Sequence, residues 1–426
     1  MRRREINLYF ASVSPGDAAF LVSRWFGAAI AGGRQWRPRF ERAVAESLGA
    51  PVVRLFGSAR GALAACLRAV RLAPGDEVIV AGFTCLAVPT AVVAAGATPV
   101  YADIDPQSLL TPLERVLEKV SRRTKAVILQ HTFGNVVEPS MVTELRGRGL
   151  IVIEDCALAA GSAGHTAQAG ASADAAVFSL ELSKTISTGW GGILVARHGR
   201  LAENLTADYE GVAEPSPARV ARMVWQTALS GILYRPAVYP AGKYLIALLF
   251  KLGIFRPSTG ADEIDGRVPP DFVVRLSPAQ AALGERMWRR LDGWRRDNAK
   301  LVERLRNVIR ARGLQPVAEG APGLSVCNRV PFLIRDRRSA IEWFAASGIE
   351  LGAWFDAPVS PMPPSGSPVP RPECPAAAFV SQHIVNLPAH QRITEADVRA
   401  IERVLTAYVA AHPDAAAIPA HGGQAT

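Results

Sequence analysis

Lys184 is a lysine in a chain that otherwise prefers arginine. It lies in the segment FSLELSKTISTGWGG, residues 178–192, and only six of the 48 basic residues are lysines. An amine can lose its proton and attack a carbonyl carbon, whereas a guanidinium cannot. The residue type therefore indicates Schiff-base chemistry, although six lysines must lie somewhere and the scarcity alone is a weak signal.

Two further polar residues follow apolar runs that are typical of strands. Asp155 ends the run GLIVIED, and Ser179 follows AAVF, five residues before Lys184. Ligands of open α/β sheets bind at the carboxyl ends of the strands, so we expect these side chains to converge. A buried carboxylate also requires a positive partner. A strand-end cap for Asp155 and a satisfied hydroxyl for Ser179 are the structural alternatives.

A turn of small residues, FGSARGAL, precedes the first helix expected to cover the sheet. The backbone N–H groups of Ala59, Arg60 and Gly61 can approach a phosphate there, because a helix N-terminus attracts anions and glycine permits close contact. A phosphate site, a buried acid and a reactive lysine together meet the needs of pyridoxal 5′-phosphate (PLP), which requires a Schiff base and an anion near its ring nitrogen.

The elements that must position these residues alternate along the chain. Short apolar runs are separated by helical patterns and Gly/Pro turns, which predicts an α/β fold with a mostly parallel sheet covered on both faces. We expect strands in residues 76–82, 98–104, 125–134, 149–156, 174–184 and 191–197. We expect helices in residues 60–72 and 86–96.

Composition narrows the class of protein. With 426 residues, of which 49% are hydrophobic, the chain can form two domains. Its net charge of +10 comes without a nucleic-acid motif, so we expect no nucleic-acid partner. The five cysteines are scattered, which predicts neither disulfides nor a metal site, and the N-terminal stretch shows no secretion signal. A cytoplasmic protein is expected.

The chain resembles a known family most closely between residues 40 and 197. The fragments PGDEVIV, AGATPVYADID, VIEDCA and TGWGG occur there in order, together with FS five residues before the lysine. This pattern is similar to that of the DegT/DnrJ/StrS-type sugar aminotransferases of PLP fold type I. The resemblance implies a large PLP-binding domain over residues 1–265 and a smaller C-terminal α+β domain over 266–413. Residues 414–426 are expected to form a flexible tail.

The resemblance also implies roles for individual residues. Lys184 would form the Schiff base and carry the proton, and Asp155 would face the ring nitrogen. Ser179 and the turn at Ala59, Arg60 and Gly61 would hold the phosphate. Cys85 occupies the position where an aromatic residue commonly stacks on the cofactor, and His131 and Trp190 are candidates for substrate contact. A core histidine is an equally good interpretation of His131.

Four positions depart from the family pattern. Leu158 replaces a polar residue near the ring oxygen, and Cys85 replaces the stacking aromatic residue. Trp190 replaces a common glutamate, and Val273 replaces an asparagine that often reaches the neighbouring subunit's phosphate. These changes leave the core chemistry in place but indicate altered substrate recognition.

The resemblance implies an aminotransferase that moves an amino group from an amino acid, usually glutamate, to a keto sugar carried on a nucleotide. Such enzymes serve cell-surface polysaccharide or secondary-metabolite biosynthesis and form homodimers. A PLP sugar dehydratase or isomerase is one alternative, but dehydratases of this family replace the lysine with histidine. A PLP-binding sensor or scaffold without turnover is the other alternative.

Residues 200–265 contain more sequence than the family usually needs. Within them, residues 243–256 combine apolar side chains with basic and aromatic residues. This composition is typical of peripheral membrane contact. Because the apolar residues nearly encircle a helix, a buried helix or a dimer interface is favoured over a membrane contact.

Overall fold

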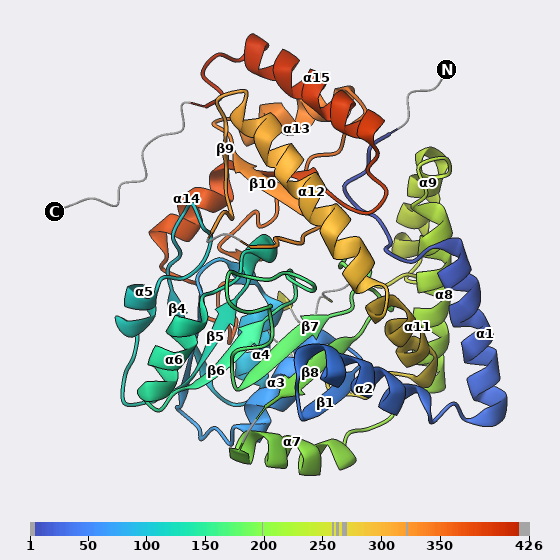
Figure 1. The fold of residues 1–426 in the computed structure, drawn as a ribbon, viewed down its shortest axis with the longest axis vertical. Coiled ribbons are helices and arrows are strands. Elements are labelled where there is room, and N and C mark those ends of the chain that lie inside the picture. Colours follow the sequence, from blue (N-terminus) through green and yellow to red (C-terminus); the bar gives the residue numbers. More distant parts are fainter. Residues whose placement is uncertain are drawn as a thin grey trace.

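The computed structural model describes residues 5–197, 199–257, 260, 264–265, 271–320 and 323–416. A seven-stranded sheet with the order β1-β8-β7-β6-β5-β2-β4 forms the centre of the large domain, in the lower half of Figure 1. Its strands are β1 (Val52–Phe56), β2 (Glu77–Ala81), β4 (Thr98–Ala102), β5 (Thr124–Gln130), β6 (Ile151–Asp155), β7 (Ala175–Ser179) and β8 (Gly192–Ala196). Only β8 runs antiparallel to its neighbours, so the predicted α/β fold with a mostly parallel sheet is confirmed.

Both faces of this sheet are apolar because helices cover both. Along β5, Ile128 packs into the core on one face, whereas Val127 and Leu129 pack into the core on the other. The first face carries α3 (Ala59–Ala69), α4 (Ala87–Ala94) and α7 (Gly199–Glu210). The second face carries α2 (Trp36–Leu48), α5 (Leu113–Leu117) and α6 (Pro139–Gly147).

A smaller antiparallel sheet, of order β12-β10-β9, lies above the large domain in Figure 1. Its strands are β9 (Gln315–Pro316), β10 (Arg329–Leu333) and β12 (Ile384–Pro388). The helices α12 (Leu291–Arg310), α13 (Arg337–Ala346) and α15 (Glu395–Ala411) share an apolar core with it. The two parts also meet where β11 (Val359–Ser360) pairs with β3 (Thr84–Cys85), and α14 (Pro375–His383) packs into the core of the large domain.

The boundary between the two parts differs from the one expected at residue 265. Helix α11 (Pro278–Trp288) packs on α1 (Pro15–Ala31) and α2 of the large domain. Conversely, Ile6 belongs to the small-domain core and bridges to Ile349. The expected tail begins later than residue 414, since the backbone of buried Ala415 accepts a hydrogen bond from Arg335. Residues 417–426 of that tail lie outside the described residues.

The segment 200–257 forms α7, α8 (Pro217–Leu233) and α9 (Tyr239–Lys251). Helix α8 packs on α1, and α9 lies at the right-hand edge of Figure 1 beside α8. Helix α9 buries Tyr239, Gly242 and Ile246. Tyr244, Leu245, Leu248 and Phe250 of this helix are exposed, so within this chain α9 is not the buried helix that the sequence favoured.

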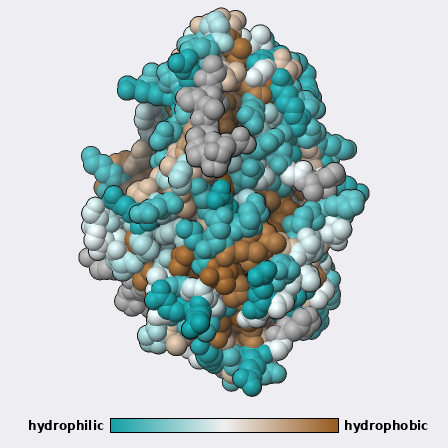
Figure 2. Space-filling view, turned by 90° about the vertical axis from the view of Figure 1, so that its left-hand side faces the viewer, coloured by the Kyte–Doolittle hydropathy of each residue, from teal (hydrophilic) through white to brown (hydrophobic). Residues whose placement is uncertain are grey.

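Two further properties, the hydropathy of the helices and the exposed apolar side chains, are relevant to contact with a membrane or another protein. None of the described helices combines the length and the hydropathy needed to cross a membrane. Figure 2 shows the face at the left of Figure 1, where hydrophobic residues gather in the lower half within a hydrophilic surround. That face lies away from α9, so the molecule exposes apolar side chains on two separate sides.

Candidate active site

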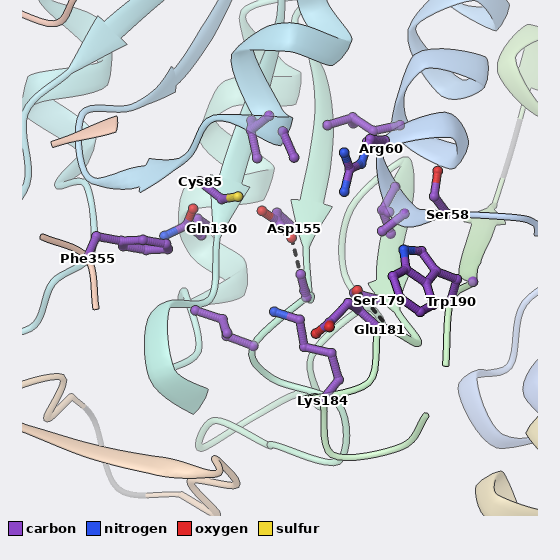
Figure 3. A pocket seen from close by; sticks show the side chains of 18 of the residues that line it. Ser58, Arg60, Cys85, Gln130, Asp155, Ser179, Glu181, Lys184, Trp190 and Phe355 are labelled. Carbon is purple, nitrogen blue, oxygen red and sulfur yellow. Dashed lines mark hydrogen bonds between the residues drawn. The ribbon is translucent and has the colours of Figure 1, made fainter. Parts of the chain in front are cut away.

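Three neighbouring strands bring polar side chains to one edge of the large sheet. Strands β5, β6 and β7 end at Gln130, Asp155 and Ser179, and Gln130 pairs in register with Asp155. Because these strands are parallel, their carboxyl ends lie side by side. Figure 3 shows Asp155 near the centre of the resulting cavity, with Lys184 and Glu181 below it and Arg60 above it.

The cavity at this edge has a volume of about 110 Å³ and is predominantly apolar. Most of the residues that the sequence singled out line it: Ala59, Arg60, Cys85, Asp155, Ser179, Lys184 and Trp190. Gly61 and His131 are not among the lining residues. The structure therefore brings the predicted lysine, acid and helix N-terminus together, as Schiff-base chemistry on a phosphate-bearing cofactor requires.

Asp155 is a buried carboxylate at the inner wall of the cavity. Its Oδ1 accepts a hydrogen bond of 2.9 Å from the backbone N–H of Ala157. Burial raises the pKa of Asp155, while this hydrogen bond and the charges of Lys184 and His131 partly oppose the rise. A carboxylate in this setting gains from a positive ligand group close by, because such a group offsets the cost of burying the charge.

Lys184 lies in the loop that follows β7 and points into the same cavity (Figure 3). Its Nζ lies 5.6 Å from the ring centroid of Trp354, in a cation–π contact. Burial lowers the pKa of Lys184, and the nearby carboxylate of Glu181 partly counteracts this effect. A lowered pKa increases the fraction of neutral amine, which is the nucleophilic form.

The N-terminus of α3 faces the cavity from the opposite side. Ser58 caps this helix by accepting a hydrogen bond of 3.1 Å from the N–H of Gly61. The N–H of Gly61 is thus already used, and Ala59 and Arg60 remain the backbone candidates for a phosphate. Gly192 permits this packing, since a Cβ there would lie 2.4 Å from the carbonyl oxygen of Ser58.

His131 belongs to the core, not to the cavity wall. Its ring is fully buried, its Nε2 lies 3.0 Å from Glu154, and its Nδ1 accepts a hydrogen bond from the N–H of Val137. The proposed substrate contact of His131 is therefore wrong for this structure, and the alternative of a core histidine holds. The preceding residue, Gln130, faces the cavity instead because side chains alternate along a strand.

Sequence reasoning missed several residues that line the cavity. Gln130 is held by hydrogen bonds to Phe83, Thr84 and Thr132, and it stands at a strand end as the predicted residues do. Glu181 lies within the segment that contains Lys184, so proximity in sequence could have indicated it. In contrast, Trp354 and Phe355 come from a distant loop that no local pattern connects to the lysine.

The four positions that depart from the family pattern occupy different places. Leu158, Cys85 and Trp190 line the cavity, so the site is more apolar and less aromatic next to Cys85 than the family pattern implies. Val273 does not line this cavity and packs beside the apolar core of α3 and α4. Three of the four departures therefore concern the wall of the site, while Lys184 and Asp155 keep their places.

Comparison with protein families decides the classification. The model of the DegT/DnrJ/EryC1/StrS aminotransferase family matches residues 27–231 and 246–406. The chain belongs to this family. The match includes the whole cavity edge of the large sheet, and it confirms the resemblance that the sequence motifs indicated.

Several curated proteins are similar to part of the chain. L-glutamine:2-deoxy-scyllo-inosose aminotransferase of Streptomyces fradiae is 35% identical over 184 residues, which is 42% of this chain and 43% of that protein. GDP-perosamine synthase of Vibrio cholerae is 36% identical over 37% of this chain and 43% of its own length. The chain thus aligns with less than half the length of these curated relatives.

The structural similarity covers more of the chain than the sequence similarity does. The crystal structure of the aminotransferase TlmJ from Streptoalloteichus hindustanus superposes with a TM-score of 0.70 over 95% of this chain and 99% of that one. The two sequences are 22% identical, so this likeness concerns the fold.

Proposed function

We propose that the protein is a PLP-dependent aminotransferase that moves an amino group from an amino acid to a keto sugar, expected to be nucleotide-linked. The observation that carries this proposal is the placement of Lys184 and Asp155 in one buried cavity below the N-terminus of α3. Biosynthesis of cell-surface polysaccharides or secondary metabolites is the proposed setting.

The residues of the cavity fit PLP. Asp155 would face the ring nitrogen, Lys184 the aldehyde carbon, and Ser179 with the first turn of α3 the phosphate. When bound, PLP supplies an electron sink that stabilises negative charge on the carbon next to the transferred nitrogen. The buried carboxylate of Asp155 fits such a group because a protonated ring nitrogen would offset its raised pKa.

The side chains have separable tasks in this proposal. Lys184, with its lowered pKa, can accept and return a proton as a neutral amine. Asp155 would stabilise a positive charge on the ring nitrogen. The indole of Trp354 and the ring of Phe355 cover the cavity from the small-domain side and reduce its contact with water.

The substrate class rests on the relatives. Their names specify an inosose, a GDP-linked perosamine and a dTDP-linked trideoxyglucose derivative, with L-glutamine as one named donor. This range supports a cyclic, sugar-like ketone as acceptor. L-glutamate is our proposed donor, and L-glutamine is the first alternative to test.

Absorbance spectroscopy of the PLP-loaded protein tests the proposal. Addition of L-glutamate or L-glutamine should shift the cofactor band, and addition of the keto-sugar nucleotide should restore it. Lys184→Ala serves as the control that cannot complete the cycle. A wild-type spectrum that stays unchanged with every amino acid would favour the PLP-binding sensor or scaffold instead.

Two proposals concern partners. A homodimer is expected for this family, and the apolar area in Figure 2 supports a surface for association.

The exposed side chains of α9 support peripheral contact of residues 243–256 with an anionic membrane, because Tyr244 and Leu248 lie near the exposed Lys251. A dimer contact through α9 is the alternative, and a cytoplasmic location stays a prediction.

A further inference from the structure

Arg329 is a buried arginine that no part of the proposed chemistry uses. It begins β10 and has an exposed fraction of only 8%. Its side chain lines a second, solvent-connected cavity of about 610 Å³. This cavity adjoins the first, since Cys85, Glu181, Trp190 and Trp354 line both. A substrate that enters the second cavity therefore reaches the space around Lys184.

The contacts of Arg329 hold the guanidinium without neutralising it. Its Cζ lies 4.2 Å from the ring centroid of Trp354 and 5.3 Å from that of Tyr9. The side chains of Tyr9 and Glu181 lie near it and partly oppose the lowering of its pKa by burial. Among the residues that the structure describes, no carboxylate forms an ion pair with Arg329. A buried guanidinium of this kind gains strongly from an anion.

The aromatic contacts also determine which part of the guanidinium is available. Cation–π contacts occupy the faces of the planar group, while its N–H donors lie in the plane. A carboxylate binds in this plane through two parallel hydrogen bonds. Arg329, held between contacts with two aromatic rings, carries a planar fork of donors that suits a bidentate carboxylate.

Arg329 and Lys184 are held in a fixed relation. The side chain of the adjacent residue, Asn328, donates a hydrogen bond of 2.9 Å to the carbonyl of Ser183, which precedes Lys184. Both cations contact the ring of Trp354. Both also line the small space beside Leu158. A ligand can therefore place one group at Lys184 and an anionic group at Arg329.

We propose that Arg329 binds the carboxylate of the amino-acid donor while the donor's amino group lies at Lys184. This inference rests on the proposed aminotransferase function and names the subsite of its first substrate. The donor must carry a carboxylate, whereas a keto sugar need not, and both would use the same cavity in turn. A nucleotide phosphate is the competing anion, and the experiment separates the two.

Calorimetric titration of the PLP-loaded protein with glutarate measures carboxylate binding without turnover, because glutarate has no amino group. Arg329→Gln should weaken glutarate binding by about 10- to 100-fold, as expected for lost charge-assisted hydrogen bonds. Arg329→Lys should fall in between, since it keeps the charge but loses the fork of donors. In the half-reaction with L-glutamate, Arg329→Gln should raise the half-saturating concentration more than it lowers the maximal rate.

Arg306→Gln is the matched control. Arg306 is equally buried in the small domain, but it lines neither of the two cavities. Equal glutarate affinity of wild type and Arg329→Gln, with both folded by melting temperature, would overturn the proposal. Weakened binding of inorganic phosphate with unchanged glutarate affinity would instead assign Arg329 to the nucleotide. Failure of the wild type to transfer amino groups would refute the proposed function and leave the glutarate result standing.

Discussion

At the scale of single residues, burial shifts the pKa values of Lys184 and Asp155, the two central side chains of the cavity. Lys184→Ala should leave the fold intact and allow weak PLP binding, but it should abolish amino transfer because no other amine lines the cavity of the described chain. Borohydride reduction followed by peptide mapping should place the pyridoxyl label of the wild type on Lys184. Lys243→Ala, at an exposed ion pair with Glu5, is the control that should keep full labelling. A label on another lysine contradicts the assignment.

Asp155→Asn tests the second side chain. The amide oxygen can still accept the hydrogen bond from Ala157, so the fold should survive. The rate should fall by about 10²- to 10⁴-fold, because an amide cannot keep the ring nitrogen protonated. Single-turnover spectroscopy with L-glutamate measures this loss, and PLP content measured in parallel checks retention. Near-normal turnover would remove Asp155 from the site.

The sequence predicts a cavity residue correctly where that residue is the last of its strand. It fails where the end of the strand is misplaced by one residue. Asp155 and Ser179 end their strands and face the cavity as expected. The same rule selected His131, which lies one residue beyond the end of β5 and turns into the core. A shift by one residue reverses the direction of a strand side chain, and sequence alone does not locate strand ends that closely.

At the scale of elements, the strands of the large sheet were the easiest to predict. A run such as Ala126–Leu129 is apolar at every position because helices cover both faces of the sheet. Helix α9 was harder, since apolar residues around a helix indicate burial in general but not which partner provides it. The structure of one chain leaves most of this helix uncovered.

Substitutions on the exposed side and on the buried side of α9 are expected to have different effects on membrane binding and on stability. Leu248 is 49% exposed, whereas Ile246 on the same helix is 7% exposed. If α9 binds anionic membranes, Leu248→Glu should abolish sedimentation with anionic liposomes at physiological salt and change the free energy of unfolding by less than about 0.5 kcal/mol. Ile246→Glu should instead destabilise the fold, because it buries an unpaired charge. Wild-type protein that stays in the supernatant would leave α9 as a dimer contact.

At the scale of the whole molecule, a histidine joins the N-terminal segment to the small domain. The Nε2 of His390 lies 2.9 Å from the carbonyl of Asn7, and its ring stacks on Phe10 at 4.3 Å. Burial lowers the pKa of His390 to about 4, and this hydrogen bond offsets only part of the shift. The folded protein therefore holds this imidazole neutral over most of the acidic range.

This lowered pKa predicts acid sensitivity. Between pH 6.5 and about 4 the unfolded chain binds a proton at His390 that the folded chain does not, so stability falls as the pH falls through this window. The loss should reach about 3 kcal/mol at the lower end, from 1.36 kcal/mol for each unit of pKa. Urea titrations across this range should show a smaller loss for His390→Gln. An identical pH dependence of the two proteins would contradict the prediction.

The position of the first residues in the small domain has a consequence for the order of events during synthesis. Leu8 bonds to Glu350, 342 residues later, and Asn7 bonds to His390, 383 residues later. At translation speeds of about 5–20 residues per second, residue 7 leaves the ribosome on the order of 20 to 80 s before its partner exists. Tyr9 lines the same cavity as Arg329 and is made 320 residues before it. The cavity of Arg329 is therefore completed late in the synthesis of the chain.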